Sequence, residues 1–177
     1  MKIAKTKLDV LQNDISEVKT DAIINPANDM LWMGGGVSSL IRKSGGETIE
    51  SEALAKAPVK IGEAVVSGAG KLKARWVIHA VISGQDLVAT DPSIRNAAKA
   101  ALDKANDLGC SSVAIPILTT DVSHIEIHIA VHIIVEETVN YLIDNNKTLT
   151  YVAFIEKDKS LCDILRDSLM EMFTKHG

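Results

Sequence analysis

The residues best suited to chemistry lie in one stretch, in which two asparagines are followed by a triple glycine. Asn25 and Asn28 precede the glycines at residues 34–36, and Ser38 follows at a position where its side chain can cap a helix. Glycine lets a backbone come close to a ligand, and the first N–H groups of a helix have no partner within it and carry the positive end of its dipole. A strand, a glycine turn and a helix start in this order favour a ligand that carries phosphate.

The same stretch also has a purely structural interpretation. Glycine turns between a strand and a helix are common, and this one matches neither the dinucleotide fingerprint nor the phosphate loop with its terminal Lys-Ser/Thr. The spacing alone leaves both interpretations open. Trp32, inside the stretch, is also open, because an indole can flank a ligand or fill the loop against the core.

The other reactive groups favour structural roles. His79 lies in an apolar run, which favours a core histidine over a catalytic one, and Cys110 and Cys162 lack the spacing of metal ligands and are too few for a disulfide framework. A stripe at four-residue spacing can hold zinc, but the Ile and Val around it favour an exposed helix face. The stripe consists of His124, His128, His132 and Glu136. We therefore predict neither a metal ion nor a cofactor.

Composition narrows the function classes. The chain has 177 residues, which suits a single domain with a full core. Its net charge of -4 offers no basic surface for duplex nucleic acid, and its 3% aromatic content leaves few rings to stack on bases. Its uninterrupted apolar runs are shorter than a membrane span. We expect a cytoplasmic protein that binds neither duplex nucleic acid nor a membrane.

Periodicity and chain breakers predict an α/β fold with helices on both faces of a sheet. We expect strands at residues 3–10, 22–25, 64–67, 75–82, 112–118 and 149–155, with Asn25-Pro26 ending the second of them. We expect helices at residues 38–44, 47–56, 93–108, 125–143 and 160–174, the third of them capped by Asp91 or Ser93. Ligands of such sheets bind beyond the carboxyl ends of strands. The loops after residues 25 and 118 should then form two walls of one crevice, which the long loop at residues 83–92 can border.

Several segments, in order along the chain, resemble the macrodomain family. They are Asn25-Pro26-Ala27-Asn28, the run at residues 34–37, Ile41, Gly45-Gly46, and residues 13–15, 62–64, 77–81 and 113–116. The resemblance covers nearly the whole chain. It implies a three-layer α/β/α sandwich with a mixed, about six-stranded sheet, and a single macrodomain over residues 1–177.

The resemblance also implies a function and a set of site residues. The expected ligand is ADP-ribose or a derivative, either free, O-acetylated or linked to a protein. Asp14 would accept a hydrogen bond from the adenine amino group, and Asn28 would bind the distal ribose and is the one catalytic candidate. The implied ligand-binding set is Asp14, Ile15, Asn25, Asn28, Gly34, Gly35, Gly36, Val37, Ser38, Thr119, Thr120, Asp121, Val122, Ser123, Phe154 and Ile155.

Two departures from the family pattern keep alternatives open. Family members that hydrolyse ADP-ribosyl esters often have Asp where this chain has Ser38, and a serine cannot act as a carboxylate base at neutral pH. The phosphate loop usually has Gly where this chain has Asp121, which puts a negative side chain near the expected diphosphate. The first hypothesis is therefore binding. The alternatives are hydrolysis of ADP-ribosyl or O-acetyl-ADP-ribose esters, and a scaffold that binds no nucleotide.

Overall fold

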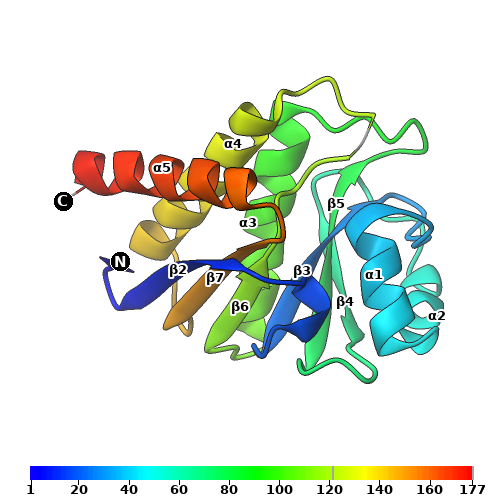
Figure 1. Ribbon diagram of the computed structural model, residues 1–177. Helices are drawn as coiled ribbons and strands as arrows, with labels where there is room; N and C mark the ends of the chain where they lie inside the picture. The colour runs from blue at the N-terminus through cyan, green and yellow to red at the C-terminus, as the bar shows by residue number, and fades with distance from the viewer. Residues whose placement is uncertain (121, 177) are drawn as a thin grey trace.

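The computed structural model describes residues 1–120 and 122–176, which form a seven-stranded mixed sheet between two layers of helices (Figure 1). The strands are β1 Lys2–Ile3, β2 Thr6–Gln12, β3 Ala22–Asn28, β4 Ala64–Gly68, β5 Trp76–Ser83, β6 Ser112–Ile115 and β7 Tyr151–Glu156. The helices are the short η1 Ile15–Glu17, then α1 Gly36–Gly45, α2 Thr48–Leu54, α3 Asp91–Asp107, α4 Ile127–Asp144 and α5 Lys159–His176. The predicted three-layer α/β/α class is confirmed.

The sheet order is β1-β2-β7-β6-β3-β5-β4. The five inner strands from β2 to β5 pair in parallel, whereas the edge strands β1 and β4 are antiparallel to their neighbours. The seventh strand arises because the expected strand at residues 3–10 is a tight hairpin that turns at Ala4, whose φ is 50°. Parallel strands of one sheet end at the same edge, so β3, β5, β6 and β7 deliver the loops that follow them to one side of the molecule.

Both faces of the sheet are covered, as the alternation of strands and helices predicts. On one face α3 packs on β5 and β4, and α5 packs on β2 and β7, with α4 between α3 and α5. Their core includes Ile78, Ile94, Leu102 and Phe154. On the other face α1 packs on β3 and α2 on β4, around the smaller core of Ile23, Met33, Ile41 and Val77. None of the helices in the described part of the chain combines the length and the apolar character that crossing a membrane requires.

Several predicted boundaries are wrong, and three of them concern β3, α3 and β6. Asn25-Pro26 does not end β3, which continues to Asn28. Strand β6 pairs only with Ala22 and Ile23, so no strand lies beside Pro26 on that side. The N–H that proline lacks is therefore not needed for a hydrogen bond there. Helix α3 is capped by Thr90, whose side chain accepts from the Ser93 N–H in a capping box. Strand β6 ends at Ile115, before Pro116.

Candidate ligand-binding cleft

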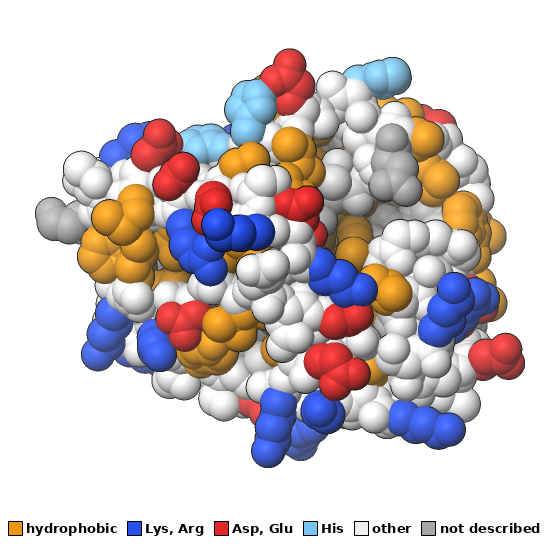
Figure 2. Space-filling view, viewed as in Figure 1, with side chains coloured by type: hydrophobic (Ala, Val, Ile, Leu, Met, Phe, Trp, Pro, Cys, Tyr) orange, Lys and Arg blue, Asp and Glu red, His pale blue; other side chains and the backbone are white. Residues whose placement is uncertain are grey.

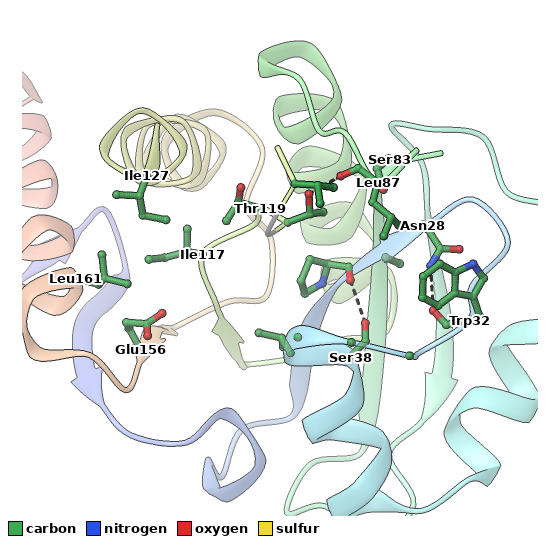
Figure 3. A pocket seen from close by; sticks show the side chains of 18 residues that line it. Asn28, Trp32, Ser38, Ser83, Leu87, Ile117, Thr119, Ile127, Glu156 and Leu161 are labelled. Carbon is green, nitrogen blue, oxygen red and sulfur yellow. Dashed lines mark hydrogen bonds between the residues drawn. The ribbon is translucent and has the colours of Figure 1, made fainter. Parts of the chain in front are cut away.

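A cleft of about 430 Å³ opens where β3, β5, β6 and β7 end (Figures 2 and 3). Figure 2 shows it as a hollow in this face with hydrophobic side chains inside it. Its lining comes from five separate parts of the chain, and Figure 3 shows the side chains meeting around it. The lining residues are Pro26, Ala27, Asn28, Trp32, Gly34, Gly35, Gly36, Val37, Ser38, Ser83, Leu87, Ile117, Thr119, Thr120, Val122, Ile127, Glu156 and Leu161.

The first wall is the glycine turn and the amino end of α1. Gly35 is the N-cap of α1, and Gly36 has a φ of +57°, a conformation that favours glycine. A Cβ at Gly34 would lie 3.0 Å from the Trp32 ring, so the turn passes closely over the indole. The first N–H groups of α1 have no intrahelical partner, and the residues that carry them line the cleft. This geometry fits the anion site that the glycine spacing favours.

Ser38 does not cap α1, contrary to the sequence prediction. Helix α1 begins at Gly36, so Ser38 already lies in its first turn. Its hydroxyl donates to Asn25 Oδ1 at 2.9 Å and lies 3.2 Å from the Pro26 carbonyl oxygen. The helix begins two residues earlier than Ser38. Gly35 is its N-cap without a side-chain hydrogen bond, and Gly36 adopts a positive φ at its first position. Ser38 therefore connects α1 to β3 beneath the cleft.

A chain of buried polar groups continues from Ser38 into the sheet. The Asn25 Nδ2 atom lies 3.2 Å from His79 Nδ1, and His79 Nε2 lies 2.8 Å from the Ser67 hydroxyl, which donates in turn to the Gly68 carbonyl. The consistent arrangement is an imidazole protonated at Nε2 that accepts from Asn25 at Nδ1. Burial, assisted by the Lys56 ammonium, lowers the pKa of His79 to about 4. His79 is therefore a neutral core histidine, as the apolar run around it predicts. Asn25 is fully buried in this chain and does not reach the cleft lining.

The second wall follows β6 and contributes two threonines. Thr119 and Thr120 line the cleft beside Val122, and the Thr120 hydroxyl donates to the carbonyl of Leu87, which also lines the cleft. Ser123 stands behind this wall, where its hydroxyl bonds with Thr120 Oγ1 at 2.7 Å and accepts from the Ala89 N–H at 3.0 Å. Asp121 lies outside the described residues.

At the far end, Asp14 of the expected base pocket already has partners within the protein. Asp14 accepts from the backbone and hydroxyl of Ser16 and pairs with Lys157 at 2.8 Å. Burial opposes ionisation of Asp14, but the hydrogen bonds from Lys157 and Ser16 outweigh it and lower the pKa of the carboxyl. Ile15 is buried beside the smaller core, with Ile155 in the same cluster.

Four residues that sequence reasoning missed line this end of the cleft. Phe154 is fully buried and Ile155 is only 2% exposed, so the residues that reach the cleft from this region are Glu156 and Leu161. Ile117 and Ile127 add to this apolar end (Figure 3). The alternating pattern of this strand could have been extended to Glu156, but the pattern does not show at which residue β7 ends.

Among the described lining residues, Glu156 is the one charged side chain. The walls otherwise offer backbone N–H groups, hydroxyls and amides between apolar surfaces. Such a cleft suits a guest with one apolar, planar end and a polar middle, held by directional hydrogen bonds.

The Macro domain sequence model matches residues 24–134, which is more than half of the chain. The chain belongs to the macrodomain family. An uncharacterized protein of Aquifex aeolicus is 37% identical to this macrodomain over 155 residues, which cover 87% of this chain and 92% of that protein. Other relatives are longer than the region they share: the match covers 64% of an Aeropyrum pernix protein and 33% of a Mycobacterium tuberculosis protein.

Solved structures share the fold of this macrodomain. The Oceanobacillus iheyensis macrodomain with ADP has a TM-score of 0.85 and 25% identity, and the match covers 99% of this chain and 96% of that one. The Trypanosoma brucei macrodomain in complex with ADP-ribose has a TM-score of 0.81 and 22% identity, and the match covers 90% and 68% of the two chains. The second of these similarities establishes the fold alone.

Three members of the stripe, His128, His132 and Glu136, lie on α4 apart from the cleft, whereas His124 precedes the first residue of α4. His128 is exposed and His132 is half-buried, and the carboxylates near them are Glu126 at 3.3 Å and Glu136 at 3.9 Å. No group of three potential metal ligands comes together among the described residues. Glu136 instead pairs with Arg95 of α3 at 2.6 Å, so this part of the stripe joins two helices.

Proposed function

We propose that this macrodomain binds ADP-ribose, free or attached to a protein, in the cleft. The observation that carries the proposal is the amino end of α1, whose glycine turn faces a second wall of threonine hydroxyls across one cleft. Unpaired helix N–H groups are suited to a diphosphate. The related macrodomain structures with ADP and with ADP-ribose support the same class of ligand.

The two ends of the cleft suggest how the ligand lies. The apolar end at Ile117, Ile127 and Leu161 suits an adenine ring. Asp14 is not among the lining residues, but it pairs with Lys157, the neighbour of the lining residue Glu156, and would accept from the adenine amino group there. The opposite end, at Asn28 and Trp32, suits the distal ribose. Between them, residues 34–37 and the loop that begins at Thr119 would enclose the diphosphate.

Binding ranks before hydrolysis because of the chemistry around the predicted ribose. Ester hydrolysis needs a group that activates water, and Ser38 donates its proton to Asn25 within the protein. The one charged side chain of the described lining, Glu156, lies at the apolar end. An ADP-ribosylated protein as partner and a cytoplasmic location stay predictions of the sequence, as do the single-domain organisation and the lack of nucleic-acid binding.

Isothermal titration calorimetry with ADP-ribose tests the proposal. We expect one site per chain, and an absence of binding at millimolar ligand would reject the proposed function in favour of the scaffold alternative. Release of product from an ADP-ribosyl ester by the unaltered protein would instead support the hydrolase.

We predict that Asp14→Ala weakens ADP-ribose binding about tenfold and leaves binding of ribose 5-phosphate unchanged. The lost interaction is a charge-assisted hydrogen bond to the base, which contributes roughly 1.5–3 kcal/mol when no other group competes for the carboxylate. Competition with Lys157, 2.8 Å away, keeps the expected loss at the lower end.

Asp163→Ala is the matched control for Asp14→Ala. It removes the same charge from the exposed face of α5, where Asp163 pairs with Arg166 three residues later. We expect unchanged binding of both ligands by this variant. Equal weakening of ADP-ribose and ribose 5-phosphate by Asp14→Ala would show that Asp14 does not contact the base.

A further inference from the structure

Asn28 has almost all of its hydrogen-bonding capacity taken up by the protein. Its Oδ1 atom accepts from the Met30 N–H at 3.1 Å, and its Nδ2 donates to the Trp32 carbonyl at 2.9 Å. A backbone N–H can only donate and a carbonyl can only accept, so these two bonds fix which side of the amide is oxygen. One N–H of Asn28 is left for a ligand.

Gln85, in the loop between β5 and α3, completes this arrangement. Its Nε2 donates to Asn28 Oδ1 at 3.2 Å and to Asp29 Oδ1 at 2.7 Å. Its Oε1 accepts from the Trp32 indole N–H at 2.8 Å. The Gln85 amide thus uses both donors and its oxygen on three residues around one end of the cleft, two of which line it.

The loop that carries Gln85 also reaches the opposite wall. Two residues further on, the Leu87 carbonyl accepts from the Thr120 hydroxyl, and Leu87 itself lines the cleft (Figure 3). One loop therefore bonds to the β3 side through Gln85 and to the β6 side through Leu87.

We propose that Gln85 is a positioning residue of the cleft, which holds the Asn28 amide with one N–H available to the ligand and holds the Trp32 indole as the wall beside it. The proposal rests on the proposed function for the identity of the ligand. Without Gln85, the amide and the indole would each lose a bond that fixes their orientation, and the ligand would have to order both on binding. The loss should be confined to ligands that reach Asn28.

Calorimetry with two nucleotides tests the effect on the ligand, because ADP lacks the distal ribose that ADP-ribose carries. Gln85→Met keeps the length of the side chain and removes all three bonds. We expect it to weaken ADP-ribose roughly tenfold and ADP less than twofold, since about one net hydrogen bond of orientation is lost. Asn96→Leu likewise replaces an exposed amide by an apolar side chain of similar length, at a position of α3 outside the cleft lining, and should change neither.

Trp32 emission tests the hold on the indole without any ligand. In a Trp76→Phe background Trp32 is the one tryptophan, and Gln85→Met should lower its anisotropy and increase its quenching by acrylamide. Gln85→Glu replaces both N–H donors by a carboxylate oxygen that would face Asp29 Oδ1 and Asn28 Oδ1. The repulsion should displace the side chain, so this variant should also increase acrylamide quenching of Trp32 and weaken ADP-ribose.

Three results would overturn the proposal: equal weakening of ADP and ADP-ribose by Gln85→Met, unchanged affinity for both, or unchanged Trp32 emission. If the unaltered protein binds neither nucleotide, the proposed function is wrong, whereas the emission measurement still decides whether Gln85 holds Trp32.

Discussion

Acidification from pH 6.5 towards pH 4 is expected to reduce the free energy of unfolding by about 3 kcal/mol through His79 alone. The pKa of His79 is lowered to about 4 in the folded state by burial and by Lys56, against an ordinary value of 6.5. The unfolded chain therefore binds a proton at a pH where the folded protein does not. The stabilisation is complete above pH 6.5 and is lost as the pH falls, at about 1.4 kcal/mol per pH unit.

Urea unfolding of the unaltered protein and of His79→Gln, between pH 7.5 and pH 4.5, measures this effect. The variant should be less stable at pH 7.5, because a flexible amide replaces the rigid ring that bridges Asn25 and Ser67, but its stability should fall less steeply below pH 6.5. His128→Gln, at an exposed position of α4, should retain the steep fall. Parallel pH profiles for the unaltered protein and His79→Gln would contradict the assignment.

Gly70→Ala is expected to destabilise the fold by about 2–5 kcal/mol. Gly70 has a φ of +54°, and a Cβ there would lie 2.1 Å from the Gly45 carbonyl oxygen at the end of α1. The conformation costs roughly 1–2 kcal/mol for a residue with a side chain, and forcing the two backbone segments apart costs about 1–3 kcal/mol more. For a chain of this size the melting temperature should fall on the order of 10 °C.

Gly109→Ala separates the two costs. Gly109 also has a positive φ, of +71°, but a Cβ there would meet nothing within 4 Å. Its melting temperature should fall by about a third as much, measured by differential scanning calorimetry. Equal falls for the two variants would show that the contact between Gly70 and Gly45 is not tight. Since this contact holds the C-terminal end of α1 in place, Gly70→Ala should also weaken binding of ADP-ribose at the N-terminal end of the same helix.

Periodicity was sufficient to predict the layers of the sheet and the walls of the cleft. The apolar runs around Ile23, Ile78 and Val113 became central parallel strands, because each is covered on both faces. The glycines at residues 34–36 and the threonines after β6 then had to meet, since their strands are adjacent and end at one edge.

Contacts between segments distant in sequence could not be predicted. Pro26 continues β3 only because β6 is short, which local propensity does not encode. The Ser38 hydroxyl donates to Asn25 because the fold places the Asn25 side chain below the first turn of α1. Asp14 pairs with Lys157 because β2 and β7 are neighbouring strands. Gln85 gave no signal at all: an exposed glutamine in a loop acquires its importance from Trp32 and Asn28, more than fifty residues earlier.

The described lining of the cleft contains no lysine or arginine. A diphosphate in it would therefore be held by oriented peptide dipoles and neutral hydroxyls, which do not attract a charged molecule from a distance. Ionic strength should then have little influence: between about 50 and 500 mM sodium chloride we expect the dissociation constant for ADP-ribose to change less than threefold, because screening acts mainly on exposed pairs of full charges. Association should also proceed without electrostatic steering, so that selectivity among nucleotides resides in how slowly each one leaves.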